Sequence, residues 1–265
     1  MANEPGEPGE SDRKVSGTAA GKCGIIKNSA KFDGEGNEMK RYAVMLSGGT
    51  GTRMGDPVPK QYQRVKGKML FEYTLQSLCA VAFEAIVIVA APEWVDAIRQ
   101  VLPDGKFLFA APGENRQLSV WNALQVLKTE AQEDDAVLIQ DAARPMTKPE
   151  LIEACLEKLE QEADADGVVP VLPMKDTVYL SRDGKCLTQT LVRSEVVAGQ
   201  APEAFRFGFY YRATEKLLPQ EILTINGSAE PAMRAGGHIC TIAGDESNLK
   251  ITTPLDLERF IHELE

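Results

Sequence analysis

The chain has 265 residues, 43% of them hydrophobic, and a formal net charge of −10. This length suits one α/β domain with additional segments, and no run approaches the roughly 18 apolar residues of a membrane span. The acidic balance argues against nonspecific nucleic-acid binding, which needs a basic face, but allows a nucleotide in a local cationic pocket.

The cysteines and histidines of the chain limit the kinds of disulfide, metal and catalytic site that we expect. The five cysteines are scattered, odd in number and without Cys-x-x-Cys spacing. They predict reduced thiols in a cytoplasmic protein rather than a disulfide framework or a zinc site. With only His238 and His262 in the chain, we do not expect a catalytic or metal centre based on histidine.

Residues 1–38 are rich in Gly, Glu, Lys and Ser, and their one apolar pair is Ile25-Ile26. Such a segment cannot bury enough surface to order itself, and it lacks the apolar core of a signal peptide. We therefore expect a disordered N-terminal extension followed by one domain over 39–265. Because Met39 directly precedes the first predicted strand, we expect a chain that begins there to fold and bind nucleotide.

The first predicted strand leads into a loop dense in glycine. Tyr42 to Leu46 is a short apolar run, typical of a strand buried on both faces, and Ser47-Gly48-Gly49-Thr50-Gly51-Thr52-Arg53-Met54-Gly55 follows it. Glycines let backbone N–H groups approach an anion closely. Arg53 and Lys60 add two cations, so the segment suits a polyphosphate.

Three interpretations of this loop fit less well than a long loop that wraps phosphates. A P-loop needs Gly-Lys-Ser/Thr, whereas Gly55 is followed by Asp56-Pro57. A dinucleotide fingerprint needs a helix that begins within the glycines, and Pro57 and Pro59 come too soon for that helix. An ordinary glycine-rich turn seldom needs this density of glycine with Arg and Lys. A long loop that wraps phosphates and ends in Pro-Lys fits best.

Gly48 to Gly55, followed by Pro59-Lys60-Gln61-Tyr62, resembles the signature of sugar-phosphate nucleotidyltransferases. Within them it resembles the cytidylyltransferases that act on methylerythritol phosphate or ribitol phosphate. The resemblance implies an α/β fold with a doubly wound, mostly parallel, Rossmann-like sheet and a projecting β-hairpin arm. It also implies that CTP is held by Leu46, Ser47, Gly48, Gly49 and Gly51.

The next elements alternate between helix and strand. Apolar spacing predicts helices over 69–83 and 93–102, and apolar runs predict strands over 85–90 and 106–110. Gly113 to Val120 then leads into a helix that runs to about 130. This segment resembles the family's Gly-acid-x-Arg-x-x-Ser-Val motif, which borders the cytosine and ribose of CTP and would use Gly113, Glu114, Arg116 and Ser119. The alternative is an ordinary helix start with a capping residue.

The strand predicted over 136–140 ends in Asp141-Ala142-Ala143-Arg144-Pro145. Ligands of parallel α/β sheets bind at the carboxyl ends of strands. Asp141 can hold Mg²⁺ or a ribose hydroxyl there, and Arg144 can face a substrate phosphate. The pentapeptide resembles the cytidylyltransferase branch, which places Asp141 and Ala142 at CTP, although Gln140 stands where the family usually has His. A strand-end Asp that caps its own turn is the alternative for Asp141 alone.

A helix over 148–163 and a strand over 167–172 precede a β-hairpin signal. Two extended segments, 175–181 and 185–192, flank Arg182-Asp183-Gly184. Such an arm, at about 173–197, has exposed edges that need a partner. In the resembling family the arm hooks onto a second subunit, which implies a homodimer in which Thr177 and Arg193 reach the acceptor phosphate. The alternative is a surface hairpin in which these two residues have no special role.

Two later segments depart from the family pattern. Gln200-Ala201-Pro202-Glu203-Ala204-Phe205 stands where the family usually has Gln-Thr-Pro-Gln-x-Phe. After a helix expected over 209–217, Asn226-Gly227-Ser228-Ala229-Glu230 occupies the place of a Thr-Asp-Asp/Glu stretch near the acceptor polyol. The expected hydroxyl and carboxylates are missing there, and either Ser228 or Glu230 could substitute for them.

Gly244-Asp245-Glu246-Ser247-Asn248-Leu249-Lys250-Ile251-Thr252-Thr253 resembles the family's terminal Gly-x-x-x-Asn-x-Lys-hydrophobic-Thr motif, whose Lys approaches the phosphates. A last helix is predicted over 254–264, with Pro254 at its start and one apolar face. The resemblance thus runs from Tyr42 to the C-terminus.

The resemblance implies that an oxygen of a polyol phosphate attacks the α-phosphorus of CTP and that pyrophosphate leaves. The catalytic residues would be Arg53, Lys60 and Lys250, with Mg²⁺ bridging phosphate oxygens and Asp141 as its protein ligand. The acceptor stays open between methylerythritol phosphate, which implies isoprenoid biosynthesis, and ribitol phosphate, which implies CDP-ribitol formation. Two other classes also stay open: a non-catalytic nucleotide-binding protein, suggested by the altered 226–230 region, and an NAD-dependent oxidoreductase, against which Pro57 and Pro59 count.

Overall fold

The computed structural model of the chain describes residues 39–49 and 58–265. The predicted extension over 1–38 lies outside the described residues, as do Gly51 and Arg53 of the glycine loop. No helix within the described ranges is long and apolar enough to cross a membrane.

The core of the fold is an eight-stranded sheet with the order β10-β7-β11-β6-β1-β4-β5, in which β12 also pairs with β7. Strands β6, β1, β4 and β5 are parallel neighbours, and β12 is parallel to β7. Strand β11 runs antiparallel between β6 and β7, and β10 runs antiparallel to β7. The predicted doubly wound, mostly parallel sheet is therefore confirmed. The strands are β1 (Arg41–Leu46), β4 (Ala85–Val89), β5 (Phe107–Ala110), β6 (Ala136–Asp141), β7 (Gly167–Pro173), β10 (Val197–Gly199), β11 (Glu203–Arg206) and β12 (Ile239–Ala243).

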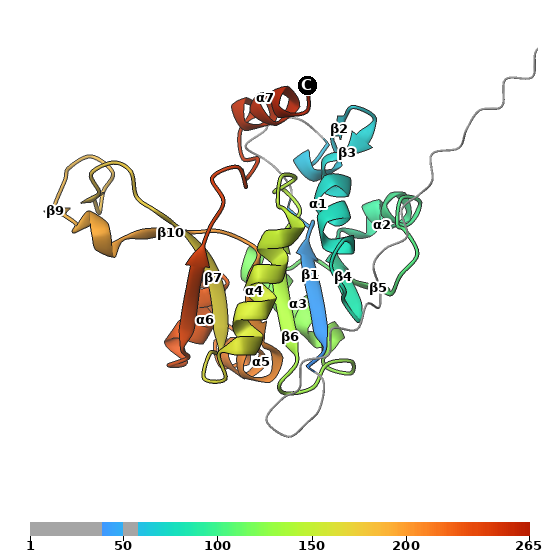
Figure 1. Cartoon of the computed structure of the whole chain (residues 1–265), viewed down its shortest axis with the longest axis horizontal. Helices are drawn as coiled ribbons and strands as arrows, with labels where there is room; N and C mark the ends of the chain where they lie inside the picture. The colour runs from blue at the N-terminus through green and yellow to red at the C-terminus, as the bar shows by residue number, and fades with distance from the viewer. Residues whose placement is uncertain (1–38, 50–57) are drawn as a thin grey trace, which may run out of the picture.

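Helices cover both faces of this sheet (Figure 1). Because side chains alternate along a strand, Ala43 and Met45 of β1 pack with α1 and α4, while Tyr42 and Val44 pack with α3 and α5. This explains why β1 is apolar throughout. The helices are α1 (Leu70–Cys79), α2 (Pro92–Arg99), α3 (Arg116–Leu127), α4 (Pro149–Gln161), α5 (Phe207–Glu215), α6 (Ala229–Arg234) and α7 (Pro254–Glu263), with 3₁₀ turns η2 (Lys60–Tyr62), η3 (Arg193–Glu195) and η4 (Glu221–Thr224).

Several predicted helices are too long at their C-terminal ends. The helix predicted over 69–83 ends at Cys79, because the chain turns there and buries Val81 and Phe83 in the same core cluster. The apolar pattern continues past the end of the helix. Strands β10, β11 and β12 and helix α6 were not predicted.

The predicted arm is present and projects from the sheet (Figure 1). Its hairpin pairs β8 (Tyr179–Leu180) with β9 (Gln189–Thr190). The turn uses Gly184 at φ +69°, where a side chain would be strained, and Asp183 accepts hydrogen bonds from two backbone N–H groups. Leu187 and Val192 are largely exposed on this arm.

The carboxyl ends of the parallel strands are covered by elements distant in sequence. The hairpin of β2 (Arg64–Val65) and β3 (Lys68–Met69) packs with α7 through a small cluster that includes Val65, Leu70, Ile251 and Phe260. In Figure 1 these elements lie beyond the tip of β1. The cluster holds the terminal motif over the edge of the sheet where the predicted site residues gather.

Candidate active site

Asp141 is the last residue of β6 and lies in register with Leu46, the last residue of β1. The backbone N–H of Ala142 donates to the Leu46 carbonyl oxygen at 3.0 Å. Two strand ends predicted to contact CTP are thus adjacent, as expected where parallel strands meet one edge of a sheet.

Cationic side chains from three parts of the chain surround the buried Asp141 carboxylate. Arg116 contacts Oδ1 through Nε at 3.1 Å and Nη2 at 3.0 Å. Lys250 Nζ lies 2.7 Å from Oδ2, and Arg144 Nε lies 3.9 Å from it. Burial by itself raises the pKa of Asp141, but these positive charges outweigh it and hold the pKa well below the usual range. Asp141 is therefore an ionised acceptor at neutral pH.

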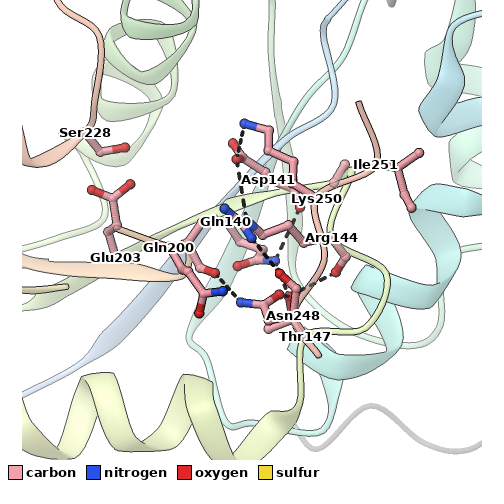
Figure 2. A network of polar contacts seen from close by, with 12 residues as sticks. Gln140, Asp141, Arg144, Thr147, Gln200, Glu203, Ser228, Asn248, Lys250 and Ile251 are labelled. Atoms are coloured by element: carbon pink, nitrogen blue, oxygen red, sulfur yellow. Dashed lines mark hydrogen bonds and ion pairs between the residues drawn. The ribbon is translucent and has the colours of Figure 1, made fainter. Parts of the chain in front are cut away.

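The terminal motif is tied to the turn that follows Asp141 (Figure 2). The Ile251 N–H donates to the Ala143 carbonyl oxygen at 2.8 Å, and Arg144 Nη1 donates to the Asn248 carbonyl oxygen at 2.7 Å. The Asn248 amide in turn donates to the Ala201 carbonyl oxygen at 2.8 Å. These bonds fix the backbone on both sides of Lys250.

Gln140, which stands in place of the family's usual His, is fully buried beneath this site. Its Nε2 donates to Thr147 Oγ1 at 2.8 Å, and Thr147 also bonds the Asn248 side chain at 2.9 Å. Gln140 therefore belongs to the buried network that supports Arg144 and Asn248 (Figure 2).

Lys60 reaches the same region from the segment that closes the glycine loop. Its Nζ donates to the Ile251 carbonyl oxygen at 2.6 Å, one residue along from Lys250. Gln61 Nε2 donates to the carbonyl oxygens of both Ser47 and Gly49 at 2.7 Å. The Pro-Lys-Gln-Tyr segment thus positions one cation and holds the start of the glycine loop.

The loop before α3 packs closely against the glycine loop. A Cβ at Gly48 would lie 2.5 Å from the Pro112 side chain, and one at Gly113 would lie 2.3 Å from Leu118. Ser119 accepts from the Gly113 N–H at 2.9 Å, while Asn115 caps the helix by accepting from Leu118. The helix start is thus capped in the ordinary way by Asn115. The same segment also carries the motif residues Gly113, Arg116 and the exposed Glu114.

Two residues near Arg116 were not among the residues assigned to CTP or to catalysis from sequence, although Ser228 was considered as a substitute near the acceptor polyol. Ser228 Oγ accepts from Arg116 Nη1 at 2.6 Å, and Glu203 Oε1 lies 3.8 Å from Arg116 Nη2. Figure 2 shows both on the same side of Asp141. Glu230, the other residue considered for this region, pairs with Arg234 at 2.6 Å instead. An acidic residue between apolar neighbours, Pro202 and Ala204, was the signal in the sequence for Glu203.

Thr177 and Arg193 lie on the exposed arm rather than in the Asp141 cluster. Arg193 Nη1 donates to the Lys175 carbonyl oxygen at 3.0 Å. Arg193 and Lys175 border a surface hollow at the root of the arm, together with apolar residues that include Val196 and Val197.

Comparisons with known proteins show the family of the chain. The family model "IspD: 2-C-methyl-D-erythritol 4-phosphate cytidylyltransferase" matches residues 42–262. The chain is 35% identical to the 2-C-methyl-D-erythritol 4-phosphate cytidylyltransferase of Ralstonia nicotianae over 82% of this chain and 88% of that protein. It is 29% identical to the ribitol-5-phosphate cytidylyltransferase of Lactiplantibacillus plantarum over 82% and 94%.

Solved structures give the same result. The crystal structure of 4-diphosphocytidyl-2C-methyl-D-erythritol synthase from Anaerococcus prevotii matches with a TM-score of 0.74 and 25% identity, over 85% of this chain and 96% of that one. The resemblance read from the glycine loop, the Asp-Ala-Ala-Arg-Pro turn and the terminal motif is thereby confirmed. The chain belongs to the 2-C-methyl-D-erythritol 4-phosphate cytidylyltransferase (IspD) family.

Proposed function

We propose that the chain transfers the cytidylyl group of CTP to the phosphate of a short polyol phosphate, giving a CDP-polyol and pyrophosphate. The observation that carries this proposal is the meeting of Asp141, Lys250 and Lys60 with the start of the glycine loop at one sheet edge. Methylerythritol phosphate and ribitol phosphate, for which the relatives are named, are both acceptors of this class.

In this reaction an oxygen of the acceptor phosphate attacks the α-phosphorus of CTP, and the bond from that phosphorus to the bridging oxygen of the β-phosphate breaks. The nucleophile is already an anion, so no protein base is required. Catalysis then depends on positioning and on neutralising the charge that develops on the phosphates. Lys60 and Lys250 are suited to this role, and we assign Arg53, outside the described residues, the same role.

Asp141 acts as an acceptor that organises the nucleotide side of the site. An ionised carboxylate can only accept hydrogen bonds, so it can hold a ribose hydroxyl while its contact with Lys250 directs that cation toward the phosphates. Gly48 packs closely against Pro112, and Gly113 against the start of α3, so the glycine loop and the loop before α3 lie together, and their backbone N–H groups would face a triphosphate and a base.

The residues present fit Mg²⁺ that arrives with the triphosphate. Among the described residues no group of three or more His, Cys, Asp or Glu side chains could hold a metal ion. Magnesium bound to a nucleotide needs only one or two carboxylates, because phosphate oxygens and water supply the other ligands. Asp141 would hold it, and the bound ion would supply neutralisation of phosphate charge.

We further propose that residues 39–265 form one catalytic domain that works as a cytoplasmic homodimer. The exposed apolar side chains of the arm, including Leu187 and Val192, support a protein partner. Thr177 and Arg193 would then reach the acceptor phosphate of the second subunit. The five cysteines of the chain, odd in number and without Cys-x-x-Cys spacing, fit a reducing compartment.

The test is pyrophosphate release from CTP and Mg²⁺ with a panel of polyol phosphates that includes methylerythritol 4-phosphate and ribitol 5-phosphate. We expect release with at least one acceptor and little without any. CTP binding without release would favour a non-catalytic nucleotide-binding protein. A fluorescence titration that shows NADH binding in place of CTP binding would favour an oxidoreductase.

A further inference from the structure

Arg116 lies between two carboxylates, one of which the proposed function does not use. Its Nε and Nη2 contact Asp141 Oδ1, while Nη2 lies 3.8 Å from Glu203 Oε1. Its Nη1 donates to Ser228 Oγ at 2.6 Å. Every guanidinium nitrogen is thus directed at a protein group, so the charge of Glu203 bears on how Arg116 holds Asp141.

Glu203 is an unfavourable residue for the fold alone. It begins β11, between β6 and β7, and is 9% exposed. Burial raises the pKa of Glu203, and the negative charge of Asp141 raises it further. The charge of Arg116 and hydrogen bonds from Ser228 and Ala229 lower the pKa, but the net shift is upward. A glutamine of the same shape would keep an acceptor oxygen at this place without a buried charge. The fold therefore does not explain why this position carries a carboxylate.

We propose that Glu203 is a positioning residue for the transfer reaction, which holds Arg116 between itself and Asp141 and so leaves Asp141 Oδ2 to Lys250 and the substrates. This inference rests on the proposed function. When Glu203 is neutral, Arg116 pairs with Asp141 alone and neutralises it more completely. Asp141 then has less charge with which to direct Lys250 or to hold a ribose hydroxyl.

A carboxylate at position 228 would also contact Arg116. The Ser228 hydroxyl already lies 2.6 Å from Arg116 Nη1, so an aspartate there would contact the same guanidinium group. Glu203 and Ser228 flank the same guanidinium group, at 3.8 Å from Nη2 and 2.6 Å from Nη1, so a carboxylate at either position would face Arg116. We infer that one carboxylate beside Arg116 is required and that it can come from either side.

The experiment is a double-mutant cycle with Glu203→Gln, Ser228→Asp and the double variant. The readouts are CTP affinity by calorimetry with Mg²⁺, kcat/KM for the best acceptor of the panel, and the urea midpoint. We expect Glu203→Gln to weaken CTP binding and lower kcat/KM by about tenfold, the scale of coupling within one ion-pair network. We expect the double variant to return to within about threefold of wild type.

The urea midpoint of Glu203→Gln distinguishes a positioning role of Glu203 from a structural role. Because the raised pKa of Glu203 means that folding disfavours its charged form at neutral pH, Glu203→Gln should leave the urea midpoint unchanged or raise it. The matched control is Glu160→Gln, which changes another buried carboxylate, 2.6 Å from Arg41 Nε at the amino end of β1. That variant should lower the midpoint and leave CTP affinity and kcat/KM within about twofold.

Wild-type kinetics and CTP affinity in Glu203→Gln would overturn the inference. So would a double variant no better than Glu203→Gln. If wild type binds CTP but releases no pyrophosphate with any acceptor, the transferase proposal fails, and the calorimetric cycle still decides the role of Glu203. If wild type does not bind CTP, both proposals fail together.

Discussion

Replacing Lys250 by methionine removes an ammonium group and keeps an unbranched side chain of similar length. That ammonium group lies 2.7 Å from Asp141 Oδ2, on a side chain that is 37% exposed. Losing one preorganised charge donor costs about 3 kcal/mol of transition-state stabilisation, which corresponds to a fall in kcat of about 100-fold. Because Asp141 keeps Arg116 and the pair is partly exposed, the free energy of unfolding should change by only about 1 kcal/mol or less.

The assay is steady-state pyrophosphate release at saturating CTP and acceptor, with urea denaturation in parallel. Lys106→Met is the matched control, because Lys106 Nζ lies 2.5 Å from Glu130 on a side chain that is 50% exposed. Lys106 precedes β5 at the opposite end of the sheet. The role of Lys250 is refuted if Lys250→Met keeps kcat within about threefold of wild type, or if Lys106→Met loses as much activity.

Three further predictions follow from the neighbouring contacts. Lys60→Ala should lower turnover about 100-fold and keep the circular dichroism spectrum, whereas near-normal turnover would remove Lys60 from catalysis. Gly113→Ala should lower the free energy of unfolding by about 1–3 kcal/mol because its Cβ meets Leu118. Gly49→Ala, whose Cβ would have no described residue within 4 Å, should change the free energy of unfolding by about 0.5 kcal/mol or less, and equal urea midpoints for the two variants would contradict this contrast. Partial burial raises the pKa of Asp256, but hydrogen bonds from Thr252 and Thr253 lower it to about 2. The unfolded value is about 3.9, so the stabilisation is complete above about pH 4 and is lost as the pH falls toward about 2. Asp256→Asn should thus be less stable than wild type at neutral pH by about 1 kcal/mol; a gap that stayed the same at about pH 2 in urea titrations would contradict the assignment.

The sequence was sufficient for the central strands because they are buried on both faces. Tyr42 to Leu46 and Ala136 to Ile139 are uninterrupted apolar runs, and helices with one apolar face alternate with these strands. The hairpin of the arm was also predictable, since Arg182-Asp183-Gly184 provides the turn residues. These features are local, so a single sequence carries them.

The short strands at the other side of the sheet have no such local pattern. Strand β11 has four residues and opens with the charged Glu203, and β12 is only partly buried. Their pairing depends on β7, which neither segment approaches until the chain is folded. Periodicity cannot predict strands that are fixed by distant partners.

The same limit applies within the site. The motif residues Asp141, Lys60 and Lys250 were identified from sequence, and the structure brings them together. The contact of Arg116 with Ser228 joins positions 112 residues apart, and no local signal distinguishes Ser228 from Glu230. Only the folded chain shows which of the two faces Arg116.

The most direct test is a calorimetric titration of CTP with Mg²⁺ into wild type and into Lys250→Met. A triphosphate held at the carboxyl ends of the parallel strands predicts saturable binding to wild type and binding about tenfold weaker in the variant, the scale of one charge-assisted hydrogen bond. No heat of binding with wild type, or equal affinity in both proteins, would contradict it.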